Sequence, residues 1–398
     1  MTASTTTPIA NRYVFSAMAT CLLMMASVLW IPAQLGAMAQ GYAIDMRMLG
    51  LLASAEIFGF LAGTIAGSFI AVDRMKPWVL TGAACVVAAN LALSLFAPRI
   101  PFIVMRPLAS FGGGLAFAYA LKICSKSAHP TRSFGIFTGL MSTMMILGFQ
   151  EVGHMLAARA GADGVTSAIG AAQVSRVVFT MYACMAVLGA LVLLGNQPKL
   201  AKDGRSRANV AAAALPPAVF VGLAAIALSF VGQGCIFSFL QTMGVAHGFP
   251  VDGVANAMSA WALFGIIGSF SVGAMPEAMP RWVLIAMALL AMGFGYFALY
   301  APSSSLPLYM VGCAIGGFYW NFILPLMLGL LARVDPSGFG SVWGGSMSSV
   351  GSMIGPVIAG LLISGANYTR VAGVSILLTI AGFLCVFWIE RQRPAARP

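Results

Sequence analysis

Three charged residues, Glu56, Arg106 and Glu151, lie well inside long apolar stretches of the sequence. A charge in the middle of a membrane-spanning helix costs about 2.5 kcal/mol or more, so it is seldom found there without a role. A rise of about 1.5 Å per residue puts Glu56 about 12 Å, Arg106 about 8 Å and Glu151 about 10 Å from the outer ends of their expected helices. We therefore expect all three to share one layer in the N-terminal half of the protein.

These residue types suit anion binding and proton transfer. Arg106 would hold a carboxylate, either of a side chain or of the substrate, and protonation of Glu56, Glu151 or His154 would break that pair. His154 lies within one helical turn of Glu151. The alternative is structural: a permanent ion pair between Arg106 and Glu151 that only fixes helix packing, with His154 packed near the outer surface. The sequence alone leaves both interpretations open.

The C-terminal half has no charged residue in the middle of an apolar run and offers neutral polar and aromatic side chains instead. We therefore expect proton coupling in the N-terminal half and recognition of substrate shape in the C-terminal half. The candidate substrate-binding residues, besides Arg106, are Gln34, Tyr119, Gln233, Gln241, Trp261, Trp320 and Asn321. For each of them, packing or a hydrogen bond between helices is the competing interpretation.

The elements that must position these residues are membrane-spanning helices. Hydrophobic residues make up 60% of the chain, charged residues 8%, and the mean hydropathy is +0.94, whereas a soluble domain carries roughly 25% charged residues. The apolar runs are long and do not alternate with polar residues, which favours helices of about 20 residues over strands. We predict an all-α membrane protein with twelve spans, at 14–36, 48–72, 77–97, 101–123, 134–158, 176–196, 214–240, 253–275, 282–301, 306–332, 339–364 and 370–389.

An internal repeat divides these spans into two halves. The segment GSFIAVDRMKPWVL at 67–80 returns about 205 residues later as GSFSVGAMPEAMPRWVL at 268–284, and Gly41–Asp45 returns as Gly248–Asp252. Such a repeat predicts two pseudo-symmetric bundles of six helices with a binding site between them. We place the bundles at residues 1–196 and 213–398, joined by a polar cytoplasmic linker at 197–212.

The distribution of basic residues sets the orientation. With a cytoplasmic N-terminus, every lysine and most arginines fall on the cytoplasmic side, as the positive-inside rule requires. We predict a multi-pass protein of the cell inner membrane with both termini in the cytoplasm. The net charge of +11 then reflects basic loops at an anionic leaflet, and no nucleic-acid partner is needed. The seven cysteines show no metal-ligand spacing, and no catalytic motif is present, so we expect no metal, no cofactor and no enzyme activity.

Several motifs resemble those of the major facilitator superfamily, over essentially the whole chain. Asp73-Arg74 match that family's loop between helices two and three, although Phe69 and Lys76-Pro77-Trp78 depart from it. Arg106 is followed by small residues at Ser110, Gly112 and Gly114, as in the family's fourth helix, and Gly355-Pro356 with Gly360 fits its eleventh. The resemblance implies alternating access between two six-helix halves, with Asp73 and Arg74 as a cytoplasmic gate.

The expected function is proton-coupled symport of a small organic anion, a carboxylate, by a monomer in the lipid bilayer. Arginine with two acids nearby favours an anionic solute. One alternative is a proton-driven multidrug exporter of the same fold, in which a single acid in an aromatic cavity would bind a cationic substrate. A more remote alternative is a membrane sensor that transports nothing.

Overall fold

The computed structural model describes residues 10–128, 130–161, 166–196, 216–274, 281–300, 305–335, 339–364 and 367–391. These residues form helices and connecting turns, with two isolated bridges and no strand among them. The helices of the first half of the chain are α1 (Asn11–Met24), α2 (Ala26–Leu29), α3 (Ile31–Tyr42), α4 (Met46–Phe69), the short 3-10 helix η1 (Val72–Arg74), α5 (Met75–Phe96), α6 (Phe102–Ser125), α7 (Pro130–Ala157) and α8 (Ala168–Gly195). Those of the second half are α9 (Pro217–Phe237), α10 (Leu240–Ala246), α11 (Val251–Ala274), α12 (Arg281–Tyr300), α13 (Leu306–Val334), α14 (Phe339–Leu362) and α15 (Thr369–Arg391).

The predicted fold class is confirmed. Among the described residues, eleven helices are long and apolar enough to cross a membrane. The remaining predicted span is the first one along the chain, and it is divided among α1, α2 and α3. Together they give the twelve segments expected from hydropathy.

The span predicted at 14–36 is interrupted in the structure, where the helix breaks at Met25 and at Trp30. Pro32 explains the second break: it lacks an N–H group, and its ring would clash with the carbonyl of the residue four positions earlier. The first helix of the second half is broken as well, at Ser238 and Phe239 between α9 and α10. The first span of each half is therefore interrupted, at positions separated by close to the repeat length.

The chain forms two compact units that do not follow the two halves of the sequence. Unit 1 comprises Met1–Trp30, Phe58–Met144 and Ser175–Arg207, and unit 2 comprises Ile31–Ile57, Met145–Val174 and Ala208–Pro398. Unit 2 thus combines the helices of the second half with α3 and with parts of α4, α7 and α8. The predicted linker at 197–212 lies outside the described residues, and the division of the chain at that point stays a prediction.

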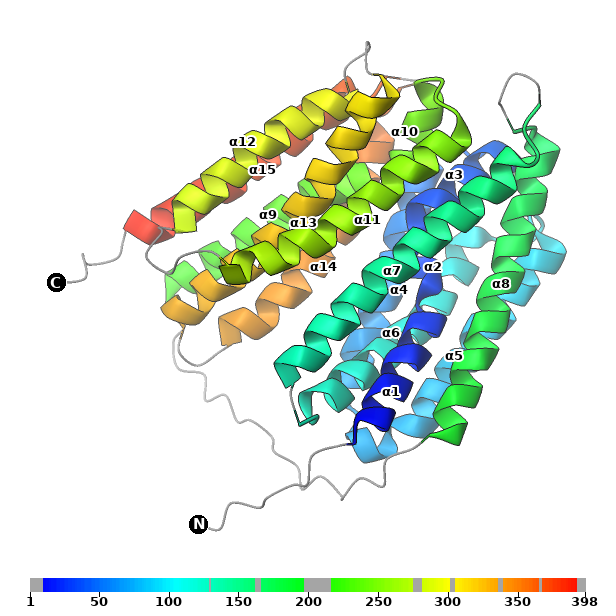
Figure 1. The fold of residues 1–398 in the computed structure, drawn as a ribbon, viewed down its shortest axis with the longest axis horizontal. Helices are drawn as coiled ribbons and strands as arrows, with labels where there is room; N and C mark the ends of the chain where they lie inside the picture. Colours follow the sequence, from blue (N-terminus) through cyan, green and yellow to red (C-terminus); the bar gives the residue numbers. More distant parts are fainter. Residues whose placement is uncertain are drawn as a thin grey trace. The chain divides into compact units, whose positions relative to one another are not determined.

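Within each unit the helices pack along their lengths. In unit 1, α6 lies against α5, α1 and α2. In unit 2, α13 lies against α11 and α12, α9 lies against α14 and α15, and α10 contacts α3. Figure 1 shows the yellow α12 beside the red α15, a pair that also belongs to unit 2.

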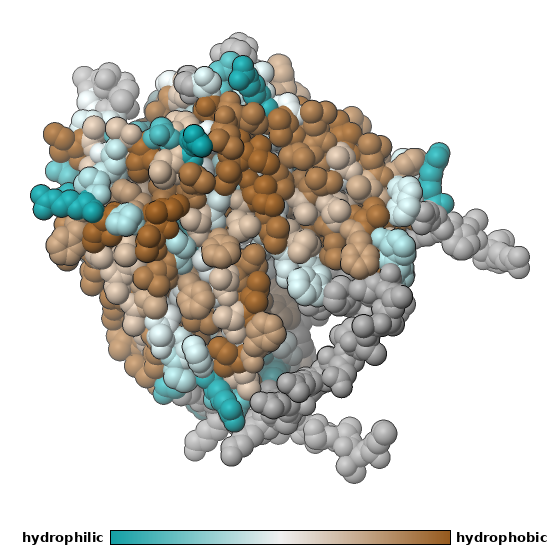
Figure 2. All heavy atoms as spheres, turned by 180° about the vertical axis from the view of Figure 1, so that it is seen from behind, coloured by the Kyte–Doolittle hydropathy of each residue, from teal (hydrophilic) through white to brown (hydrophobic). Residues whose placement is uncertain are grey.

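The surface has the character of a protein that faces lipid. The side of the molecule in Figure 2 is mostly hydrophobic, with hydrophilic residues gathered in small patches. Large apolar side chains project outward, with exposed fractions of 85% for Phe69 and 76% for Leu290. Such exposure is unfavourable in water and favourable in a bilayer, where apolar residues on the helix surface meet acyl chains.

A stability prediction follows from the packing of α11 on α13. A Cβ atom added at Gly317 would lie 1.9 Å from the backbone oxygen of Trp261, so α13 must move away from α11 to accept any side chain there. Overpacking of this kind costs about 1–3 kcal/mol. We expect Gly317→Ala to lower the thermal unfolding temperature in detergent by several degrees. Gly293→Ala in α12 is the control, since nothing lies within 4 Å of the added Cβ there; an equal loss in both variants would contradict the prediction.

Candidate functional site

Among the residues that the structure describes, two charged side chains within helices are fully buried. Glu56 in α4 is 0% exposed and Arg106 in α6 is 1% exposed. Glu56 belongs to unit 2 and Arg106 to unit 1. Burial of a carboxylate and of a guanidinium is costly in an apolar environment, and proteins retain such groups mainly where they serve a function.

Arg106 is held against two aromatic rings of α8 in the same unit. Its guanidinium carbon lies 5.9 Å from the ring centroid of Phe179 and 5.9 Å from that of Tyr182. Both distances are within the range of cation–π attraction. The two rings orient the planar guanidinium and keep water from it, which suits the recognition of a carboxylate.

Glu151 and His154 are exposed on α7, unlike Glu56. Their neighbour Gln150 links α7 to α11, because its Nε2 donates 2.9 Å hydrogen bonds to Oδ1 of Asn256 and to Oγ of Ser259. The proposed proton-coupling residues therefore differ in environment: one is enclosed and two are accessible. Sequence reasoning missed Gln150, because its partners lie more than 100 residues later in the chain.

Three glutamines predicted to bind substrate are buried in unit 2: Gln34 at 0%, Gln233 at 0% and Gln241 at 1% exposure. Gln241 lies where α10 meets α3, since a Cβ added at Gly36 would come within 2.0 Å of its Cγ. Neither amide atom of Gln233 or of Gln241 has a hydrogen-bond partner in the structure. Buried amides are normally satisfied, so these two indicate places where water or a ligand completes the bonding.

The structure brings Trp261 and Trp320 together. Their ring centroids are 6.2 Å apart in an edge-to-face arrangement, although the residues lie on α11 and α13. Phe230 and Phe237 of α9 join them at 5.2 Å and 5.5 Å from Trp320, and both were missed because nothing distinguishes them among the 26 phenylalanines. Asn321 is half-buried and donates to the backbone oxygen of Gly317 at 3.3 Å.

The remaining predicted residues belong to unit 1. Tyr119 is 4% exposed on α6. Asp73 and Arg74 lie on η1, the former half-buried and the latter exposed. The turn before η1 is held by Lys122, whose Nζ donates to the backbone oxygens of Gly67, Ser68 and Ile70. The gating role of Asp73 and Arg74 stays a prediction.

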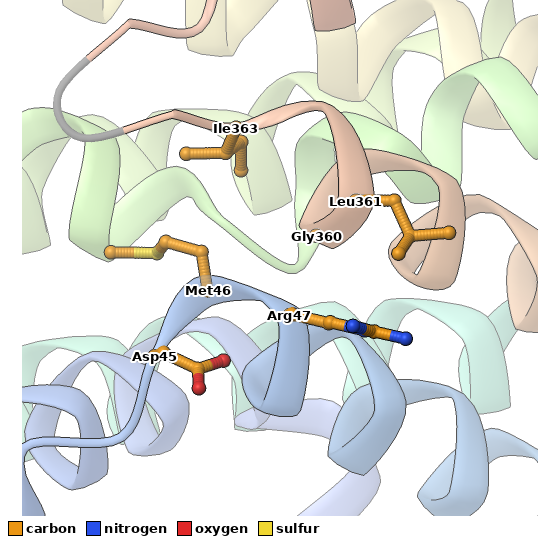
Figure 3. Close-up of a pocket in the computed structure, with 6 residues that line it drawn as sticks. All are labelled: Asp45, Met46, Arg47, Gly360, Leu361 and Ile363. Carbon is orange, nitrogen blue, oxygen red and sulfur yellow. The ribbon is translucent and has the colours of Figure 1, made fainter.

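Unit 2 also has a surface cavity of about 550 Å³, which is lined by other residues. Asp45, Met46 and Arg47 at the start of α4 line one side, and Gly360, Leu361 and Ile363 at the end of α14 line the other (Figure 3). Asp45 caps α4, since its Oδ1 accepts a 2.7 Å hydrogen bond from the backbone N–H of Met48. None of the predicted site residues lines this cavity, and its two charged residues are exposed.

Among the described residues, no group of three His, Cys, Asp or Glu side chains is placed to bind a metal ion. The buried polar side chains include Arg106, Glu56, four carboxamides and a larger number of serine and threonine hydroxyls, and Asp335 is buried at the end of α13. Such side chains bind and orient a small molecule, and Glu56 offers a buried site for a proton within a helix.

Comparison with known proteins agrees with the fold. The chain is 22% identical over 382 residues to the 3-(3-hydroxy-phenyl)propionate transporter of Escherichia coli (strain K12), covering 91% of this chain and 90% of that one. It is 29% identical over 169 residues to an uncharacterized MFS-type transporter, YceJ, of Bacillus subtilis (strain 168), covering 41% and 43% of the two chains.

Solved structures show the same fold. A bacterial homolog of the human lysosomal transporter Spinster, in an inward-facing and occupied conformation, matches with a TM-score of 0.69 at 15% identity, over 96% of this chain and 97% of that one. The unoccupied form of that homolog matches with a TM-score of 0.68 at 14% identity. The family model of the Major Facilitator Superfamily matches residues 15–344. The chain is therefore a multi-pass secondary transporter rather than an enzyme, and it belongs to the Major Facilitator Superfamily.

Proposed function

We propose that this protein is a proton-coupled symporter of a small organic anion, a carboxylate, that works by alternating access. The observation that carries the proposal is Arg106, a fully buried cation flanked by two aromatic rings. A guanidinium in a low-dielectric site binds a carboxylate through two parallel hydrogen bonds and repels a cationic solute. The protein would act as a monomer in the cell inner membrane, with both termini in the cytoplasm.

The similarity to a 3-(3-hydroxy-phenyl)propionate transporter supports an anionic solute, because that relative's substrate is a carboxylate and the match covers 91% of this chain. Glu56 is the buried group that would take up the proton. Its burial supports this role, because an enclosed carboxylate is less suited than an exposed one to constant proton exchange. Exchange of the proton with water would then depend on the conformation of the transporter, as coupling requires.

The rival function is proton-driven export of cationic drugs. The aromatic rings around Trp320 favour it, since aromatic faces attract organic cations. Arg106 opposes it, because a buried positive charge raises the free energy of a cationic solute nearby.

Transport by the purified protein in proteoliposomes separates the two functions. We expect radiolabelled 3-(3-hydroxyphenyl)propionate to accumulate inside vesicles with an alkaline interior, and a protonophore to abolish the accumulation. Proton-driven movement of ethidium without carboxylate uptake would instead establish the exporter. If carboxylate uptake does not depend on the pH gradient, proton coupling is wrong and transport of an organic anion still holds.

A further inference from the structure

Four aromatic rings of unit 2 form one cluster, which we call the aromatic cluster: Phe230 and Phe237 of α9, Trp261 of α11 and Trp320 of α13. The ring centroids of Phe230 and Phe237 lie 5.2 Å and 5.5 Å from that of Trp320, and Phe237 lies 5.7 Å from Trp261. These separations are those of favourable aromatic pairs. Three different helices thus bring their rings to one place.

The cluster is rigid on one side and accessible on the other. Trp261 is 2% exposed and packs closely against α13, since a Cβ added at Gly316 would lie 2.2 Å from its ring. Trp320 and Phe237 are only half-buried, so their rings are not fully covered by protein. A fixed inner ring with partly open outer rings forms a preorganised wall for a further ring.

A buried polar residue, Gln233, lies between the two phenylalanines along α9. It lies three residues after Phe230 and four before Phe237, so helical spacing places it on the same side of α9. Its side chain is 0% exposed, and neither its Nε2 nor its Oε1 has a hydrogen-bond partner within the described parts of the chain. Desolvating an amide without a partner is unfavourable, and the penalty is removed when a bound molecule supplies a donor and an acceptor.

We propose that the aromatic cluster and Gln233 form an aryl subsite that selects a carboxylate carrying an aromatic ring with a hydroxyl substituent. The proposal deepens the proposed function and rests on it for the choice of a carboxylate as the solute. The ring of the solute would pack edge-to-face with Trp320 and Phe237, and its hydroxyl would donate to Oε1 and accept from Nε2 of Gln233. A saturated ring offers the same apolar area without the quadrupole, and an unsubstituted phenyl ring leaves the amide unsatisfied.

Three acids of equal chain length test the two parts of the subsite in competition assays on the full-length protein in proteoliposomes. Against uptake of a labelled carboxylate, we expect 3-(3-hydroxyphenyl)propionate to compete about tenfold better than 3-phenylpropionate, and 3-phenylpropionate about fivefold better than 3-cyclohexylpropionate. Gln233→Leu should remove the first preference and keep the second. Trp320→Leu should remove the second, whereas Trp320→Phe should retain most of it.

The control is Trp282→Leu, which breaks an edge-to-face pair with Phe387 at 5.7 Å outside the cluster and should leave both preferences intact. A binding measurement that needs no anion is thermal stabilisation of the protein by the neutral alcohol 3-(3-hydroxyphenyl)propan-1-ol. Stabilisation that disappears in Gln233→Leu and Trp320→Leu supports the subsite even if no acid is transported, in which case only the proposed function fails. Equal competition by the phenyl and cyclohexyl acids in the wild-type protein overturns the aryl subsite and leaves carboxylate transport standing.

Discussion

Arg106→Lys is expected to slow carboxylate uptake nearly as much as Arg106→Ala, by about 30-fold or more, because removal of one partner of a desolvated charge pair costs at least about 2 kcal/mol. Lysine keeps the charge but loses the planar fork that binds a carboxylate through two hydrogen bonds. It also loses the flat face that lies 5.9 Å from the rings of Phe179 and Tyr182. Initial rates of uptake in proteoliposomes measure the effect.

The matched control is Arg99→Lys, because Arg99 is exposed between α5 and α6 and should tolerate the change with a near-normal rate. Thermal unfolding of the same samples separates a structural role from a binding one. If Arg106→Lys unfolds at a much lower temperature than the wild-type protein, packing explains the loss. If it transports at close to the wild-type rate, the charge alone matters and the carboxylate fork is not used.

The fold could be predicted from the sequence because a bilayer allows few solutions. The apolar runs are too long and too continuous for strands, so the backbone must form its hydrogen bonds within helices. The eleven long helices among the described residues follow the predicted runs. The interruptions could not be predicted in the same way. Hydropathy averages over about 20 residues, so it passes over the break at Trp30 and the break at Ser238.

The charged residues inside the spans could also be predicted from the sequence. Whether each of them is buried or exposed could not. Glu56 and Arg106 are buried, as a charge inside a span suggests. Glu151 has the same sequence signature and is exposed. The reason is that these helices are apolar around most of their circumference, so hydropathy gives the depth of a residue along the helix and gives little information on the face that it occupies.

The aromatic cluster depends on tertiary contacts that leave no local pattern. Trp261 and Trp320 are candidates in the sequence as aromatic residues of the C-terminal spans, whereas Phe230 and Phe237 become recognisable only when α9 is seen beside α13. The same holds for Gln150, whose partners lie more than 100 residues later on α11. Contacts between distant segments are therefore the part of the site that required the structure.

Glu56→Gln is expected to abolish accumulation of the carboxylate driven by a pH gradient, while exchange of labelled for unlabelled solute across the membrane continues. Glutamine resembles the protonated glutamate in shape and charge, so it holds the site in one protonation state and cannot release a proton. Glu56 is 0% exposed in the structure, and a buried carboxyl group is the one whose access to water must change during the cycle. Uptake and counterflow in the same vesicles measure the two activities.

Glu151→Gln is the informative comparison, because the sequence alone assigns it the same role. Glu151 is exposed in the structure whereas Glu56 is enclosed, so we expect Glu151→Gln to retain more pH-driven accumulation than Glu56→Gln. The opposite order would place the proton site on α7 and make the burial of Glu56 structural. Loss of both accumulation and exchange in Glu56→Gln would show instead that the carboxylate of Glu56 is needed for solute movement itself, independent of the proton.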